Sequence, residues 1–229
     1  MKTNRNALLL VLLATVFSFA SATARADTLE LVGAPGPGDT GFVTGPYVVT
    51  DLTKNTSFLV ICDDFTTDVS MGQTWAANAY TLASLSSLKF GTSDPGGLDS
   101  SNLIQEYQAA FFLADQLVAL PNTSANTDQI DDLSYAIWGI FSSVARQSSG
   151  YALDPDAQQL AANALGMSFG SSYFNRIIYT PSPLSASQEY LTVATTPVPE
   201  PSTILLLGIG IAAAIFISYR HKPAALLQA

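Results

Sequence analysis

The sequence predicts an α+β fold for a single domain, and three observations lead to this prediction. Short segments rich in β-branched and aromatic residues come first, three helical patterns follow, and two more such segments come last. Residues 27–194 are enough for one domain with its own core. Aliphatic and aromatic residues are plentiful throughout this range, which argues against disorder.

The first part of the domain is expected to be rich in β-structure. The turn residues 54–56 separate two apolar segments, so 47–62 reads as a β-hairpin. Residues 33–45 are rich in glycine and proline and predict a loop, and 82–97 is expected to be mostly loop. Strands are predicted at 28–32, 47–52, 57–62 and 75–80, with closing strands at 173–179 and 190–194.

Three amphipathic helices are expected between these groups of strands. Residues 101–120 have apolar residues at three- and four-residue steps, with Asp99 or Ser100 as cap and Pro121 as stop. Residues 128–146 form the second pattern, with acidic residues at its start and Arg146 near its end. The third helix begins at Asp154-Pro155 and ends at Gly166.

The N-terminal residues 1–26 have the pattern of a secretory signal peptide. Lys2 and Arg5 precede an apolar run at 7–20, and the small residues Ala24 and Ala26 mark a cleavage site before residue 27. Ala22 and Ala24 frame a second cleavage site upstream. We therefore expect the following domain to be exported.

The C-terminal residues divide into three parts of different chemistry. Residues 195–203 are a proline-rich linker, which is stiff and extended. Residues 204–219 carry no charge and predict a short transmembrane helix. The tail 220–229 begins with Arg220 and Lys222, which hold the cytoplasmic side under the positive-inside rule.

This tail resembles a PEP-CTERM sorting signal, a segment also labelled an ice-binding protein C-terminal domain. The resemblance rests on the motif Val198, Pro199, Glu200 and Pro201, which is followed by the apolar segment and the basic cluster. It implies recognition by an exosortase at the inner membrane, then release to the envelope or to an exopolysaccharide matrix. In contrast to the usual pattern, seven more residues follow Lys222.

Composition narrows the function classes for the exported part. Residues 27–202 hold 18 acidic and four basic side chains, a net charge of −14, which disfavours nucleic acid as a partner. The one cysteine, Cys62, excludes an internal disulfide. The one histidine, His221, lies beyond the apolar segment, so the domain has no His-based triad or zinc site. We expect no enzyme activity and no cofactor.

A second pattern resembles bacterial surface thioester domains, in which a cysteine is cross-linked to a glutamine. Cys62 matches the cysteine, and Ala136-Ile137-Trp138 matches the segment that follows the glutamine. The glutamine position is held by Ser134, whose hydroxyl supplies no acyl group, and Gln129 lies five residues upstream of Ser134. The preferred interpretation of Cys62 is a buried apolar residue on a central strand.

Acidic and aromatic residues suggest an alternative function, a membrane-tethered module that binds carbohydrate or calcium. Calcium prefers oxygen ligands, but two of the acidic groups are explained as helix-start charges and no calcium loop is present. Trp75 is the aromatic residue expected on the surface, while Tyr107, Phe111 and Trp138 are expected in the core. The acidic groups are Asp63, Asp64 and Asp68, then Asp128, Asp131 and Asp132, then Asp154 and Asp156.

The leading hypothesis is an exported structural or adhesive protein of the envelope or matrix. It is expected to be anchored in the inner membrane as a precursor and to be an exosortase substrate.

Overall fold

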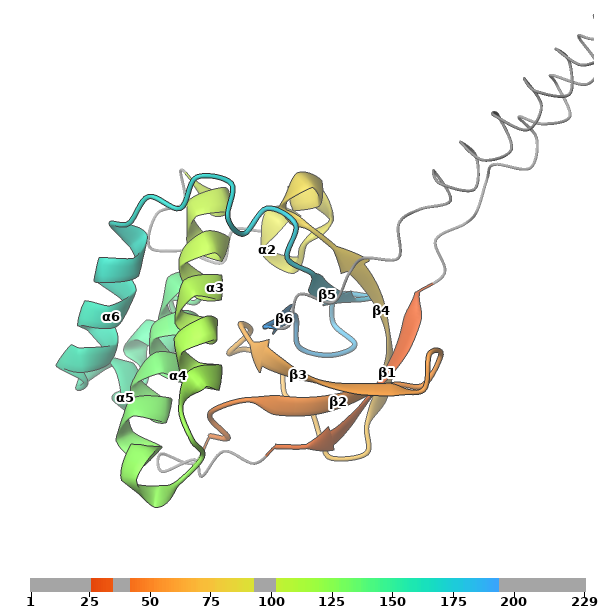
Figure 1. The fold of residues 1–229 in the computed structure, drawn as a ribbon, viewed down its shortest axis with the longest axis horizontal. Helices are drawn as coiled ribbons and strands as arrows, with labels where there is room; N and C mark the ends of the chain where they lie inside the picture. Colours follow the sequence, from red (N-terminus) through yellow and green to blue (C-terminus); the bar gives the residue numbers. More distant parts are fainter. Residues whose placement is uncertain (1–25, 35–41, 93–101, 194–229) are drawn as a thin grey trace, which may run out of the picture. The chain divides into compact units, whose positions relative to one another are not determined.

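The computed structural model describes residues 26–34, 42–92 and 102–193, which form an antiparallel β-barrel with helices beside it (Figure 1). The strands close in the order β1-β2-β3-β6-β5-β4, and all neighbours are antiparallel. Because the barrel is closed, both edges of every strand are hydrogen-bonded to a neighbouring strand. The predicted α+β class is confirmed. The strands are β1 (Asp27–Gly33), β2 (Tyr47–Asp51), β3 (Thr56–Cys62), β4 (Thr74–Tyr80), β5 (Ile178–Pro181) and β6 (Tyr190–Thr192).

The predicted hairpin at 47–62 is confirmed as β2 and β3. Tyr47 pairs with Val60 and Asp51 with Thr56. In the turn, Asn55 has a φ of 53°, a conformation that asparagine tolerates better than most residues. The Asp51 carboxylate accepts the backbone N–H groups of Thr53 and Lys54 at 2.9 and 3.1 Å, which fixes the turn locally.

Alternate residues of the strands point into the barrel and fill it with apolar side chains. Leu29, Val49, Val60 and Ala77 are fully buried there. Trp75 is also buried, with 4% of its surface exposed, and it stacks on Tyr190 at a centroid distance of 5.6 Å. The expectation of a surface Trp75 was therefore wrong. Strand alternation places its side chain inside the closed barrel.

Three helices lie where the sequence predicts them, and they pack together on one side of the barrel (Figure 1). Asn102 caps α3 in place of the predicted Asp99 or Ser100, since its side chain accepts the N–H of Gln105 at 3.3 Å. Asp154 caps α6 as predicted, with N–H donors from residues 156 and 157. The long helices are α3 (Leu103–Ala119), α4 (Thr127–Phe141) and α6 (Pro155–Leu165).

Helix α4 is the central helix of this group. It contacts α3, α5 and α6, and its residues from Leu133 to Phe141 are all buried. It ends at Phe141, so the predicted extension to Arg146 was wrong. Ser142 is extended, and the chain turns back so that the Arg146 guanidinium donates to the carbonyl of Gly139 at 2.8 Å. The positive charge of Arg146 therefore still interacts with the C-terminal end of α4, but from a residue beyond the helix.

Two other segments differ from the prediction. The expected loop 82–97 begins with two short helices because Leu82, Leu88 and Phe90 are buried and anchor it. The predicted strand 173–179 starts at Ile178, because residues 171–175 form turns after Gly170, whose φ is 57°. The short helices are η1 (Leu82–Ser87), α2 (Lys89–Thr92), η2 (Ser124–Asn126), η3 (Ala145–Gln147) and α5 (Ser149–Ala152).

Several predictions fall on residues that the structure does not describe. They are the signal peptide, most of the loop at 33–45, and the linker, transmembrane segment and tail from 195 to 229. Within 26–34, 42–92 and 102–193, no helix has the length and apolar character that crossing a membrane requires.

Candidate functional site

A pocket of about 220 Å³ opens where the loop before β2 and the loop after β3 meet helix α4. Phe42 and Tyr47 line it from the first loop and β2, and Asp64, Phe65 and Asp68 from the second loop. Trp138 of α4 forms another wall. The barrel and the helices therefore both contribute to the site.

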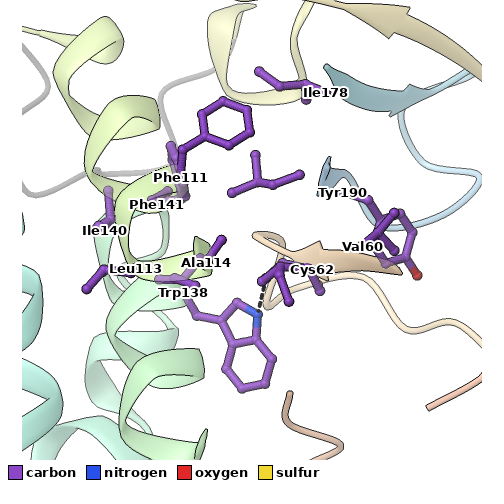
Figure 2. Packing of buried hydrophobic residues seen from close by; sticks show 14 of the residues in the cluster. Val60, Cys62, Phe111, Leu113, Ala114, Trp138, Ile140, Phe141, Ile178 and Tyr190 are labelled. Atoms are coloured by element: carbon purple, nitrogen blue, oxygen red, sulfur yellow. Dashed lines mark hydrogen bonds between the residues drawn. The ribbon is translucent and has the colours of Figure 1, made fainter. Parts of the chain in front are cut away.

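One hydrogen bond fastens the helix to the barrel at this pocket. The indole N–H of Trp138 donates to the carbonyl oxygen of Cys62 at 3.0 Å (Figure 2). Trp138 is 4% exposed, so its ring is held by packing on one side and borders the pocket on the other. The last residue of β3 and the middle of α4 are thus fixed relative to each other.

Aromatic rings form a continuous wall beside Trp138. The ring centroid of Phe65 lies 4.8 Å from that of Phe42 and 5.4 Å from that of Trp138. Tyr135, three residues earlier in α4, packs edge-on against Trp138 at a ring-centroid distance of 5.2 Å. Phe42 is 42% exposed, so this wall continues from the buried tryptophan to the surface.

A lysine that the sequence analysis did not select binds Asp64, one of the two acidic residues that line the pocket. The Lys89 ammonium group forms an ion pair with Asp64 and donates to the hydroxyl of Thr67 at 2.8 Å. The other oxygen of Asp64 accepts the N–H and the hydroxyl of Thr66 at 3.0 and 2.9 Å. Both oxygens of this buried carboxylate are therefore satisfied.

Glu189 is a second buried carboxylate, and it connects the barrel with α2 and α3. Its oxygens accept the hydroxyl of Tyr107 at 2.5 Å, the hydroxyl of Thr180 at 2.5 Å and the backbone N–H of Lys89 at 2.8 Å. Burial raises the pKa of Glu189, although these hydrogen bonds oppose the shift.

Asp63 differs from both, because neither of its carboxyl oxygens has a hydrogen-bond partner among the described residues. The side chain is fully buried. Burial raises the pKa of Asp63 well above its usual range, and the negative charges of Glu189 and Asp64 add to this shift. Burial therefore favours the neutral, protonated form of Asp63 over the charged form.

Cys62 is buried with a free thiol, as the preferred interpretation predicted. Its Sγ donates to the carbonyl oxygen of Asp64 at 3.2 Å. Burial, together with the charges of Asp64 and Asp63, raises the pKa of the Cys62 thiol well above its usual value. A thiol is a poor nucleophile compared with a thiolate, so Cys62 is chemically quiet in this setting.

The serine at the glutamine position has a structural role in the described fold. The Ser134 hydroxyl donates to the carbonyl of Ile130 at 2.8 Å and accepts the N–H of Gly45 at 3.0 Å. This links α4 to the loop before β2. Cys62 meets α4 at Trp138, nine residues or about 13 Å along the helix from the exposed Gln129, so the structure does not bring Cys62 and Gln129 into one site.

The other acidic groups are dispersed. Asp131 is buried and accepts the hydroxyl of Thr44, whereas Asp128 is exposed. The pKa of Asp132 is raised to about 7, mainly by burial and further by a hydrogen bond with Asp154 and by the charge of Asp154. Across the described ranges, no group of three or more histidine, cysteine, aspartate or glutamate residues is arranged to hold a metal ion.

The remaining predicted site residues lie outside the described ranges, except Ala26. They are the sorting motif Val198, Pro199, Glu200 and Pro201, the orientation residues Arg220 and Lys222, and the cleavage residue Ala24. Sequence reasoning missed Phe42, Phe65, Lys89 and Glu189, which lie in segments read as loops or at strand ends. The sequence feature that could have indicated the pocket is the pair Asp64 and Phe65, which directly follows a predicted strand.

Comparison with known proteins supports the interpretation of the C-terminal residues as a sorting signal. Residues 197–220 match the family model of the PEP-CTERM protein-sorting motif. A search of curated proteins gave no match. Among solved structures, the fold is similar to the N-terminal thioester domain of a surface protein from Clostridium perfringens, at 14% identity and a TM-score of 0.45. That alignment covers 73% of this chain and 97% of the other.

Proposed function

We propose that this chain is an exported surface protein that an exosortase sorts to the cell envelope or extracellular matrix, where its domain is structural or adhesive. The observation that carries the proposal is the PEP-CTERM sorting motif at 197–220, which indicates an exosortase-targeted surface protein. The acidic net charge of the preceding domain is compatible with cation-bridged contact to a matrix.

The proposed role is not enzymatic. Cys62 is the one cysteine, and its thiol is buried and kept protonated. The described domain contains no histidine, so a base for nucleophilic catalysis of the usual kind is missing from it. These features support a protein that acts by holding or binding.

The intact mass of the protein recovered from native cells and from their matrix tests this proposal. We expect a chain that begins at Asp27 and ends near the Val198–Pro201 motif. A chain that retains all residues to Ala229 in the matrix fraction would overturn the removable sorting signal.

Variants of the motif give a second test. Pro199→Ala and Glu200→Ala are expected to leave the precursor unprocessed and to reduce its surface delivery. Gln228→Ala is the matched control, because residue 228 lies beyond the matched residues. Normal processing of both motif variants would contradict recognition by an exosortase.

A second candidate function is a tethered binding module, and the aromatic pocket beside Trp138 favours it. This candidate is compatible with sorting, because an adhesive surface protein needs a ligand site.

A further inference from the structure

We propose that the pocket between the barrel and α4 binds a small organic ammonium group, as an amino sugar or a choline unit carries it. This inference rests on the adhesive role proposed above and names the chemistry of its ligand. It depends on the aromatic wall, the charge around the pocket and the state of its polar groups.

The aromatic wall supplies the first argument. Faces of aromatic rings carry negative electrostatic potential and attract ammonium groups, most strongly for tryptophan. Phe42, Phe65 and Trp138 are three neighbouring rings among the residues that line the pocket. A cation with methyl or methylene groups gains both burial and electrostatic attraction there.

Charge supplies the second argument. The charged side chains among the described lining residues are Asp64 and Asp68, and none of these residues is basic. Asp64 is neutralised by Lys89. Asp68 is exposed and forms no ion pair within the described part of the chain, so it leaves a net negative charge at the pocket. An anionic ligand would be repelled.

The hydrogen-bonding groups of the pocket disfavour a neutral sugar as the principal ligand. Both oxygens of Asp64 are already occupied, and the hydroxyl of Tyr47 donates to the carbonyl of Val43 at 2.5 Å. The side-chain oxygen of Gln188 accepts the hydroxyl of Tyr190 at 3.1 Å. A neutral ring needs many free partners, whereas an ammonium group needs aromatic faces and one carboxylate.

The volume limits the ligand to one small group. About 220 Å³ is less than the roughly 300–1,000 Å³ of pockets that enclose drug-sized ligands. The pocket therefore fits one headgroup or one sugar unit of a longer chain. Repeated weak contacts of this kind give strong attachment when many copies of the protein face a polymer.

The test is a titration of the full-length purified chain with choline chloride and with glucosamine hydrochloride, followed by tryptophan fluorescence and calorimetry. Glucose and N-acetylglucosamine are the neutral controls. The chain has two tryptophans, so Trp138→Phe identifies the part of the signal that comes from the pocket. We expect saturable binding of at least one cation, and weaker binding as NaCl is raised.

Two variants and two controls locate the site. Phe65→Ala is expected to weaken cation binding about 3- to 30-fold, and Asp68→Asn about 3- to 5-fold. Phe112→Ala, at a partly buried ring of α3, and Asp128→Asn, at an exposed carboxylate, change residues that do not line the pocket and are expected to leave binding unchanged. Circular dichroism of each variant checks that the fold is retained.

The arms of the titration separate the two sources of the cation. Stronger binding of choline assigns a methylated ammonium group, and stronger binding of glucosamine assigns an amino sugar. Equal or stronger binding of the neutral sugars would overturn the proposal, as would cation binding that Phe65→Ala and Asp68→Asn leave intact. Because this assay uses purified protein, its failure would leave the sorting proposal untouched.

Discussion

At the scale of single residues, Lys89 is the cation on which the buried carboxylates of this fold depend. Its ammonium group pairs with Asp64, and its backbone N–H binds Glu189. A buried charge that loses its partner typically costs about 3–5 kcal/mol, while exposed pairs contribute less than about 1 kcal/mol. The Asp64 side chain is 1% exposed, whereas that of Asp115, which pairs with Arg176, is 35% exposed.

Lys89→Met is therefore expected to lower the free energy of unfolding by about 3–5 kcal/mol at pH 7, because Asp64 stays buried without its cation. Asp115→Asn is the control, because its carboxylate pairs with Arg176 but is 35% exposed, and it is expected to cost about 1 kcal/mol or less. Urea denaturation measures both. Equal costs for the two variants would contradict the role given to Lys89.

Asp132 gives the fold a pH dependence near neutrality. The pKa of Asp132 is raised to about 7 by burial and by Asp154, and its ordinary value is 3.8. The folded state therefore binds the proton more tightly than the unfolded state. Stability from this group is present below pH 3.8 and is lost as the pH rises from about 4 to about 7.

Asp132→Asn should remove this loss, since an amide can donate to Asp154 without carrying charge. We expect the variant to be more stable than the parent at pH 8 by about 1 kcal/mol or less, after allowing for screening by water. At pH 4 the difference should disappear. Thermal melts at both pH values measure it, and a gain of equal size at pH 4 would contradict the mechanism.

At the scale of elements, two glycine–tyrosine contacts set how closely α4 approaches α5. A Cβ on Gly139 would lie 2.2 Å from the ring of Tyr151, and a Cβ on Gly150 would lie 2.1 Å from the ring of Tyr135. Tyr151 is 7% exposed and Tyr135 is 1% exposed, so neither ring has room to move. Glycine is needed at both positions because of this close approach.

Gly139→Ala is expected to destabilise the domain by about 1–3 kcal/mol through overpacking, in spite of the better helix propensity of alanine. Gly166→Ala is the control, since its nearest atoms would lie at 3.5 Å and its φ of −78° suits any residue. That change is expected to stay within about 0.5 kcal/mol. A neutral Gly139→Ala variant in chemical denaturation would show that the helices have room to separate.

At the scale of the whole molecule, the buried core of the described residues extends from Leu29 to Leu191. Strand β6 closes the barrel because it pairs with both β3 and β5. The folding unit is therefore expected to end shortly after β6, before the sorting motif begins.

A chain of residues 27–194 should melt within about 2 °C of the full-length protein. A chain of residues 27–187, which lacks β6, should lose cooperative unfolding because β3 and β5 are left unpaired. Scanning calorimetry compares the two. A large loss of stability in the longer fragment would mean that residues after 194 take part in the core.

Local signals were sufficient for much of the fold. The hairpin 47–62 and the helix that begins at Asp154-Pro155 were predicted correctly, because turn residues and caps act within a few positions of the chain. The end of α4 at Phe141 was not predicted, because the interaction of Arg146 with Gly139 depends on how the chain turns back. Trp75 was misplaced for a related reason, since barrel closure decides which strand face is buried.

The sequence by itself determined the sorting motif at 198–201, the α+β class and the acidic charge of the domain, and it favoured a buried Cys62. These depend on composition and on short patterns. Only the tertiary structure decided that the strands close into a barrel, that Lys89 meets Asp64, and that Phe42, Phe65 and Trp138 share one pocket. The physical reason is sequence distance: contacts such as Phe42 with Phe65 and Val60 with Thr192 join residues far apart in the chain, so packing sets them and no local pattern encodes them.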